Sequence, residues 1–197
     1  MQSAAARPTL IEALWPASRT GALARNALLA VGGSLLLTLS AKINVPFYPV
    51  PMTMQTFAVL MIGAAFGWRL GAATVLLYLA EGAAGLPVFA GTPEKGIGLA
   101  YILGPTGGYL IGFVAAAALV GWLAERGWDR GFFWLAGAMF IGHAVIFAYG
   151  IAWLASSVGF AQAWAAGVAP FYLATVFKTL LAAACMNAAW SVANLRG

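Results

Sequence analysis

Charged side chains are scarce in this chain. Only 8% of its 197 residues are Asp, Glu, Lys or Arg, and Asp and Glu together number five. With 63% hydrophobic residues, a soluble domain of this size would leave too much apolar surface in water. The mean hydropathy of +0.91 therefore predicts a polytopic membrane protein. The net charge of +5 is better explained by arginines at a membrane surface than by nucleic-acid binding.

Motifs for nucleotide and metal chemistry are also missing. The stretch GIGLAY, residues 96–101, lacks the third glycine of the dinucleotide fingerprint, and no GxxxxGK[ST] occurs, so ATP hydrolysis by a P-loop is excluded. The single histidine, His143, has no partner at metal-ligand spacing, which favours a hydrogen-bonded histidine inside a helix bundle. The single cysteine, Cys185, is expected to be a buried structural thiol. We therefore expect no metal site, no cofactor and no catalytic residues.

Six apolar segments are long enough, or nearly long enough, to cross a bilayer, which needs about 20 residues per helix. They are expected at residues 21–43, 54–66, 70–85, 105–123, 132–154 and 170–193. Because the chain has no internal repeat and no linker, residues 1–197 are expected to form one all-α membrane domain. Residues 1–20 are expected to be a short cytosolic segment with a turn near residues 10–15.

Basic residues are distributed unevenly between the predicted connections, and this predicts an orientation. With the N-terminus in the cytoplasm, seven arginines fall on the cytoplasmic side and two lysines on the other, as the positive-inside rule requires. These residues are Arg7, Arg19, Arg25, Arg69, Arg126, Arg130 and Arg196 on one side, and Lys42 and Lys95 on the other. Both termini are then cytoplasmic.

Three connections lie on the outer side in this orientation: residues 44–53, 86–104 and 156–169. The first is rich in proline, the second in glycine and proline, and the third carries no formal charge. Three prolines between residues 46 and 51 disfavour a helix there and predict an extended path. Non-helical backbone at a membrane is stable where it is buried in protein or lines a wet cavity. These loops are therefore expected to cap a binding pocket.

Residues 170–183, PFYLATVFKTLLAA, place Lys178 well inside an apolar helix. A lysine at the centre of a membrane helix costs about 2.5–3.5 kcal/mol, so such a residue usually faces a cavity or a partner. Thr175 and Phe171 lie one and two turns earlier on the same face. This face predicts a ligand pocket with a fixed positive charge. The alternative is a lysine that snorkels to the interface or pairs with a buried carboxylate, such as Glu81.

Other candidate binding residues lie in the connections. The proline-rich stretch offers Phe47 and Thr53, and Gln55 follows at the start of the second span. An amide can donate and accept hydrogen bonds to a ligand, but an amide bonded to loop backbone at a helix end explains Gln55 equally well. Phe89 could pack on a ligand ring, or it could simply plug the bundle.

Further candidates lie within the predicted spans. Gly107 and Gly108 begin the fourth span, where exposed N–H groups favour an anion, although close helix packing through small residues is the stronger interpretation. Tyr109 follows them and is more typical of an interfacial aromatic belt. Tyr78 and Glu81 lie in the third span, where Glu81 could bind the ligand or sit near the interface.

Four stretches of the chain resemble the biotin-specific substrate-binding (S) component of energy-coupling-factor transporters, the BioY family. They are AKINVPFYPVPMTMQTF (41–57), GLPVFAG (85–91), GPTGGYLIGF (104–113) and PFYLATVFKTLLAA (170–183). The resemblance implies a six-helix protein of the bacterial inner membrane that captures biotin as its ligand near the outer face. It also implies delivery inward with a transmembrane coupling (T) subunit and a pair of cytosolic ABC-type ATPases.

The chain departs from the pattern of this family at one position. The family commonly has an acidic residue three positions before the lysine, where this chain has Thr175, so the acid–lysine pair does not carry over whole. This departure lends support to an S component for another vitamin, such as thiamine or riboflavin. A second alternative is an intramembrane lipid-modifying enzyme with His143 and Glu81 as a catalytic pair, although the outer loops carry no nucleophile motif.

Overall fold

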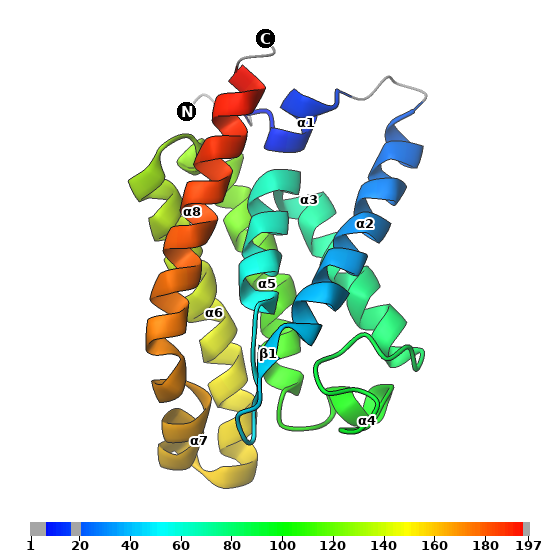
Figure 1. Cartoon of the computed structure of the whole chain (residues 1–197), viewed down its shortest axis with the longest axis vertical. Coiled ribbons are helices and arrows are strands. Elements are labelled where there is room, and N and C mark those ends of the chain that lie inside the picture. The colour runs from blue at the N-terminus through cyan, green and yellow to red at the C-terminus, as the bar shows by residue number, and fades with distance from the viewer. Residues whose placement is uncertain (1–6, 17–20, 195–197) are drawn as a thin grey trace, which may run out of the picture.

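Long apolar helices make up most of this structure, a computed structural model in which residues 7–16 and 21–194 are described (Figure 1). The elements in chain order are α1 (Leu10–Leu14), α2 (Ala22–Lys42), β1 (Asn44–Val45), β2 (Met52–Thr53), α3 (Gln55–Ala83), α4 (Leu99–Ile102), α5 (Gly107–Ala124), η1 (Trp128–Arg130), α6 (Phe132–Val158), α7 (Phe160–Gly167), η2 (Ala169–Phe171) and α8 (Tyr172–Asn194). The predicted helical class is confirmed. Arg19 and Arg196 lie outside the described residues.

Five helical segments among the described residues are long and apolar enough to cross a membrane, where the sequence predicts six. They are Ala22–Lys42, Gln55–Ala83, Gly107–Ala124, Phe132–Val158 and Phe160–Asn194. The numbers differ because the predicted second and third spans, residues 54–66 and 70–85, are joined in the single element α3. The chain is a multi-pass membrane protein.

The element α3 is broken at Gly67. Its φ of 80° and ψ of 173° are not helical, and glycine reaches this region at little steric cost. A Cβ atom on Gly71 would lie 3.0 Å from the Cα atom of Gly63, so the two arms of α3 pack back against each other. Figure 1 shows one arm rising from the strand pair and the other descending towards α4.

The helices pack in a sequence that follows the chain. Helix α3 packs mainly against α2 and α5, α5 packs also against α6, and α6 packs against α8, which contacts α3 as well. Where α3 crosses α5, a Cβ atom on Gly63 would lie 2.6 Å from the carbonyl oxygen of Ala117, so the backbones approach as only glycine permits. Buried Leu60, Val120 and Met139 fill the centre of the bundle.

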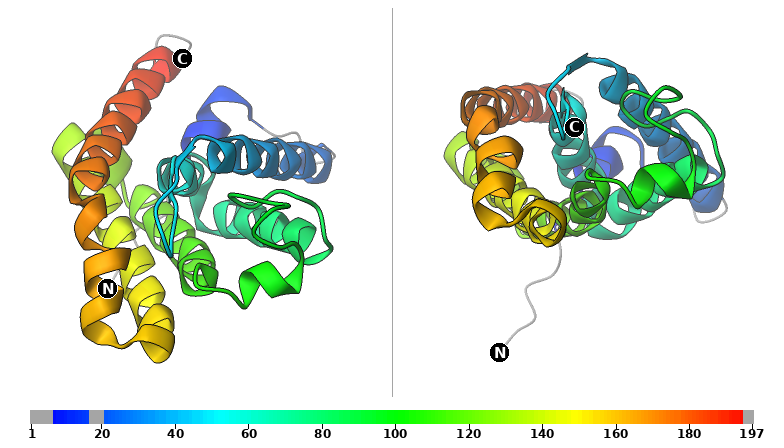
Figure 2. Two further views of the ribbon diagram at one scale, coloured as in Figure 1. Left: turned by 60° about the horizontal axis from the view of Figure 1, so that its bottom comes forward. Right: turned by 90° about the horizontal axis from the view of Figure 1, so that it is seen from below.

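The proline-rich stretch is not helical, as its composition predicts, and it lies in a short antiparallel hairpin. Asn44 pairs with Thr53 and Val45 pairs with Met52, and the prolines lie in and beside the turn between them. The hairpin, the connection containing α4, and α7 all lie at the end of the molecule opposite α1 (Figures 1 and 2). We call this the hairpin end, and the opposite one the α1 end.

The prediction of a non-helical connector at residues 156–169 is wrong. Helix α6 runs on to Val158, and after Gly159, with φ 81° and ψ 156°, the helix α7 begins. The alanine-rich sequence FAQAWAAG is a good helix former, and the missing charges do not prevent helix formation. At the other end of the bundle, the turn expected near residues 10–15 is confirmed as α1, which Thr9 and Glu12 begin with a reciprocal capping box.

Cys185 lies on the outward face of α8 and is exposed, so the expected burial of its thiol is wrong. Ala182 and Met186 on the same helix are fully buried against the bundle. Both faces of a helix between the bundle and lipid are apolar, so an apolar run does not indicate which side chains point inward.

Candidate binding pocket

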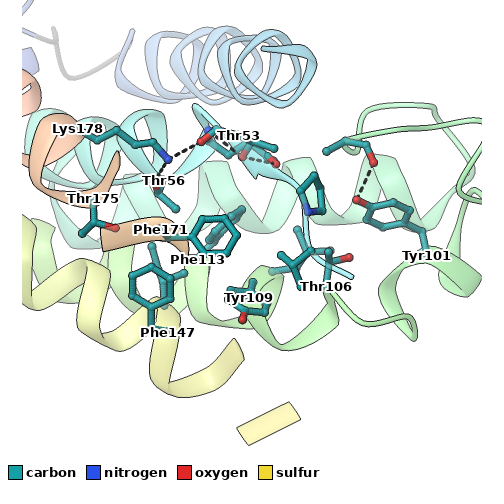
Figure 3. Close-up of a pocket in the computed structure, with 16 residues that line it drawn as sticks. Thr53, Thr56, Tyr101, Thr106, Tyr109, Phe113, Phe147, Phe171, Thr175 and Lys178 are labelled. Carbon is teal, nitrogen blue, oxygen red and sulfur yellow. Dashed lines mark hydrogen bonds between the residues drawn. The ribbon is translucent and has the colours of Figure 1, made fainter. Parts of the chain in front are cut away.

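A pocket lies between the first turn of α3 and helices α5, α6 and α8, at the hairpin end of the bundle (Figure 3). Its apolar lining consists of Val50, Pro51, Ala90, Leu110, Phe113, Ile146, Phe147 and Phe171. Its polar lining consists of Thr53, Gln55, Thr56, Tyr101, Thr106, Tyr109, Thr175 and Lys178. An aromatic and aliphatic wall with a few placed polar groups is typical of small-molecule sites.

Lys178 brings a single ammonium group into this pocket. Its Nζ atom donates to the carbonyl oxygen of Thr53 at 2.6 Å and to the hydroxyl of Thr56 at 3.2 Å. The residue is 6% exposed, and the one ion pair among the described residues joins Arg130 to Asp129 elsewhere. An ammonium has three donors, so one N–H of Lys178 is left for a ligand.

The hairpin and α3 meet at Thr53. The Thr53 hydroxyl accepts a hydrogen bond from the backbone N–H of Gln55 at 3.2 Å, which satisfies a donor at the start of α3. The Thr53 carbonyl accepts from Lys178. The lysine therefore connects α8 directly to the last residue of the hairpin.

The amide of Gln55 is held in one orientation by its neighbours. Its Nε2 atom donates to the Tyr78 hydroxyl at 2.8 Å, and its Oε1 atom accepts from the Thr53 hydroxyl at 3.2 Å. Tyr78 in turn donates to the carbonyl oxygen of Val88 at 3.1 Å. Gln55 lines the pocket, whereas Tyr78 is fully buried behind it and positions the amide.

An aromatic wall faces these polar groups. The ring centroids of Phe147 and Phe171 lie 6.2 Å apart, and Tyr109 meets Phe147 edge to face at 6.5 Å. Phe47 from the hairpin lies 6.1 Å from Phe171 and extends the wall beyond the lining residues. The Tyr109 hydroxyl donates to the carbonyl oxygen of Gly167 at 2.9 Å, which fixes the ring. The wall can take an apolar ring by stacking or edge contact.

The connection between α3 and α4 closes another side of the pocket. Phe89 is 1% exposed and lies between the rings of Tyr78 and Tyr101, with centroids 5.4 Å and 4.9 Å away. The Tyr101 hydroxyl donates to the carbonyl oxygen of Ala90 at 2.8 Å. Burial raises the pKa of Tyr101, so the hydroxyl keeps its proton and this hydrogen bond. Ala90 and Tyr101 are thereby held against the pocket.

A lysine at the end of α2 fastens the same connection. The Nζ atom of Lys42 donates to the carbonyl oxygens of Pro87, Phe89 and Thr92 at 2.8, 3.0 and 3.4 Å. It also donates to the Thr92 hydroxyl at 3.1 Å. One ammonium group thus binds several backbone carbonyl groups of a loop that has no regular secondary structure. These hydrogen bonds help to fix the position of Ala90 in the pocket wall.

The structure brings together half of the residues that the sequence proposes. Those that line the pocket are Thr53, Gln55, Tyr109, Phe171, Thr175 and Lys178. Phe47, Tyr78 and Phe89 lie in contact with lining residues and not in the lining itself.

Glu81 and the two glycines lie elsewhere. Glu81 accepts a hydrogen bond from the Ser34 hydroxyl on α2, and no ion pair among the described residues joins it to Lys178. A Cβ atom on Gly107 would lie 2.0 Å from the carbonyl oxygen of Ile102, and one on Gly108 would lie 2.3 Å from the side chain of Trp153. Both glycines therefore serve close backbone packing here.

Sequence reasoning missed several lining residues, of which Thr56, Phe113 and Phe147 matter most. Thr56 accepts from the lysine and directly follows Gln55, but a threonine inside an apolar helix gives no signal of its own. Phe113 lies four residues after Tyr109, so the helical period could have found it. Phe147 is on a helix whose faces are all apolar, and its inward direction follows only from the packing of α6.

His143 does not form the catalytic pair that the enzyme alternative needs. Its Nδ1 atom lies 3.0 Å from the carbonyl oxygen of Met139 and 3.2 Å from the Thr179 hydroxyl, between α6 and α8. Where the chain is described, no hydrogen bond joins His143 to Glu81. In the same residues no group of three His, Cys, Asp or Glu side chains is placed to hold a metal ion.

Comparisons with known proteins agree on one group. A model of the BioY family matches residues 10–194. The probable biotin transporter BioY of Pyrococcus horikoshii is 42% identical over 147 residues, covering 75% of this chain and 85% of that protein. The biotin transporter BioY of Thermotoga maritima is 37% identical over 149 residues, with coverage of 75% and 85%. A crystal structure of the S-component for biotin from an ECF-type ABC transporter shares the fold, with a TM-score of 0.75 at 22% identity, over 87% of this chain and 93% of that one.

Proposed function

Because the chain belongs to the BioY family, as its four motifs predict, we propose that it is the biotin-binding membrane subunit of a vitamin uptake transporter. The observation that carries this proposal is a buried ammonium with a free N–H, which faces an aromatic wall across a small pocket. Biotin combines an apolar thioether ring, a polar ureido edge and a carboxylate tail. The pocket offers a counterpart to each of these groups.

We assign the groups of biotin to the pocket by their chemistry. The ammonium of Lys178 takes the carboxylate or the ureido oxygen, because a charge-assisted hydrogen bond is the strongest that this pocket can form. The thioether ring packs against Phe147 and Phe171, and the amide of Gln55 pairs with the ureido edge. Thr175 borders the same space and takes the place of the acidic residue common in the family.

The membrane arrangement that we propose has six spans in one domain, with the two arms of α3 as the second and third. Both termini lie in the cytoplasm of a bacterial cell, whose inner membrane the chain crosses, and the hairpin end faces outward. The described arginines support this, since all five lie in or beside elements at the α1 end, while Lys42 and Lys95 lie towards the hairpin end (Figure 1). The five are Arg7, Arg25, Arg69, Arg126 and Arg130.

Energy for uptake must come from partners in this proposal. The chain carries no P-loop motif, so it needs a transmembrane coupling (T) subunit and cytosolic ABC-type ATPases to move biotin uphill. The similar fold of an S-component from an ECF-type ABC transporter supports this assembly.

Binding of radiolabelled biotin to the purified full-length chain in detergent tests the proposal. We expect saturable binding that unlabelled biotin displaces and that thiamine and riboflavin do not. Displacement by thiamine or riboflavin instead would make the chain an S component for another vitamin. Folded protein that binds no labelled biotin would contradict the proposal.

A further inference from the structure

An apolar furrow lies on the outward surface of α5 at the α1 end, far from the biotin pocket. It is lined by Trp68, Ala115, Ala118, Leu119 and Trp122. Four of these residues recur at helical spacing along α5 and so form one stripe. The alanines leave a hollow beside the two larger indole rings, which are 40% and 42% exposed.

The furrow continues into a polar groove formed by α1, α2 and the break in α3. Trp68 lines both spaces, so an apolar and a polar surface meet at its indole ring. The groove carries three arginines and two glutamates: Arg7, Arg25, Arg69, Glu12 and Glu125. Both carboxylates accept backbone hydrogen bonds, Glu12 from Thr9 and Glu125 from Trp68. The groove therefore has an excess of positive charge.

Two guanidinium groups lie at the mouth of the furrow. The Cζ atom of Arg69 is 5.1 Å from the centroid of the Trp68 ring, and that of Arg126 is 3.3 Å from the Trp122 ring. Arg126 also donates to the carbonyl oxygen of Trp122 at 3.2 Å. Neither arginine forms an ion pair with a carboxylate in the part of the chain that is described. Both cations are exposed and are free to bind an anion.

We propose that this surface binds an anionic phospholipid, with one acyl chain in the furrow and its phosphate on Arg69 and Arg126. A guanidinium matches the geometry of a phosphate, and the indole rings lie where tryptophan marks the boundary between acyl chains and headgroups. One phospholipid molecule supplies both an acyl chain for the apolar furrow and an anion for the two arginines, whereas an apolar helix of another subunit would fill the furrow alone. Charge complementarity therefore selects the lipid.

Native mass spectrometry of the full-length chain, released from bilayer discs with equal phosphatidylglycerol and phosphatidylcholine, tests this site. The wild type should retain phosphatidylglycerol preferentially. In the double variant Arg69→Gln/Arg126→Gln this preference should fall roughly tenfold to thirtyfold, as the loss of two surface cations implies. Ala118→Phe should fill the furrow and reduce retention of both lipids.

Two control variants test whether losing any cation, or adding any aromatic ring, is enough to change lipid retention. Lys95→Gln removes a cation at the other end of the molecule, and Ala144→Phe adds a ring at an exposed position of α6, so both should retain lipid like the wild type. Biotin binding should be unchanged in every variant, which checks the fold.

Three results would overturn the proposal. The first is an unchanged lipid preference in the double arginine variant. The second is displacement of the lipid by millimolar inorganic phosphate, which would assign the arginines to a soluble anion. The third is loss of a co-purifying protein in Ala118→Phe with lipid retention unchanged, which would make the furrow a protein interface.

Discussion

At the scale of single residues, the pocket is dominated by a buried ammonium that has no carboxylate partner among the described residues. Lys178 is compensated by the carbonyl dipole of Thr53 and the hydroxyl of Thr56. Neutral acceptors offset only part of the free energy needed to remove a cation from water. A ligand that brings a carboxylate or another strong acceptor offsets more of it, so the pocket favours such a ligand.

Thr175→Asp tests how this chain manages without the acidic residue of its relatives. Thr175 is 7% exposed and borders the pocket one helical turn before Lys178, so an aspartate there reaches the ammonium on the same face. Binding of biotin should survive, with a dissociation constant within roughly tenfold of the wild type. Thr179→Asp is the matched control, since it buries a charge beside His143 and should disrupt the bundle. Folded Thr175→Asp protein that has lost binding would show that the carboxylate occupies the ligand's place.

The buried carboxyl group of Asp129, at the α1 end, is expected to make the stability of the folded protein depend on pH. It is 2% exposed, its Oδ2 atom accepts from the indole N–H of Trp190 at 2.8 Å, and its Oδ1 atom lies 3.5 Å from the Nε atom of Arg130. Burial raises the pKa of Asp129, although Arg130 and the hydrogen bond from Trp190 oppose the shift. The folded state therefore holds this proton more tightly than the unfolded state, and stability falls as pH rises from the unfolded pKa through the folded one.

Asp129→Asn should remove this dependence, because the amide oxygen still accepts from Trp190 and carries no charge. Thermal unfolding of the detergent-purified protein between about pH 4 and about pH 7 measures it. The midpoint of the wild type should fall relative to that of the variant as the pH rises. Parallel curves for the two proteins would contradict the prediction.

At the scale of elements, Lys42 holds the connection between α3 and α4 in place. Its ammonium gathers the carbonyl oxygens of Pro87, Phe89 and Thr92. Lys42→Met removes these hydrogen bonds, and charged bonds of roughly 1.5–3 kcal/mol imply amide exchange about tenfold to a hundredfold faster at residues 87–92. Hydrogen exchange with mass spectrometry measures this, and biotin binding should weaken at the same time.

Asn44→Ala provides the comparison for Lys42→Met. The Asn44 side chain lies beside Lys42 but donates only to the carbonyl oxygens of Ala41 and Lys42, not to the loop. Exchange at residues 87–92 should remain at the wild-type rate in this variant. Equal acceleration in both variants would mean that the hairpin as a whole, and not the lysine, orders the loop.

At the scale of the whole molecule, most features of the fold could be predicted from the amino-acid composition and from the positions of the prolines. The helical class follows from the shortage of charge, and the absence of helix at residues 46–51 follows from the three prolines there, although they do not predict the pairing of the hairpin. The helix at residues 160–167 could not be recognised, because an uncharged connector and an apolar helix have similar composition. The same ambiguity hid the exposure of Cys185, which depends on how α8 packs.

The residues of the candidate site also fall into two groups, those that the sequence indicates and those that only the tertiary structure reveals. Lys178 is evident from the sequence because a charge in an apolar helix is costly, and Thr175 and Phe171 follow from the helical period. Phe147 and Tyr101 come from segments distant from Lys178 in the chain, and only packing brings them into the same pocket. Tertiary contacts of this kind leave no local signal in one sequence.

Orientation is tested by labelling single cysteines with a membrane-impermeant maleimide. Because Cys185 is exposed, the background should carry Cys185→Ser. Glu94→Cys, on the exposed loop of the hairpin end, should react in intact cells, whereas Arg126→Cys should react only after lysis. The reverse pattern would place the hairpin end in the cytoplasm and refute the proposed direction of uptake.

The most direct test of the account is calorimetric titration of biotin into the wild type and Lys178→Met. Methionine has a similar length but no donor, so the dissociation constant should rise by a factor of about ten to a few hundred, as the loss of a charge-assisted hydrogen bond implies. Lys178→Arg should restore only part of the affinity, since a planar guanidinium needs different room. Lys95→Met, which removes an exposed lysine at the same end, should bind like the wild type. Wild-type affinity in folded Lys178→Met protein would contradict the account and remove the lysine from the site.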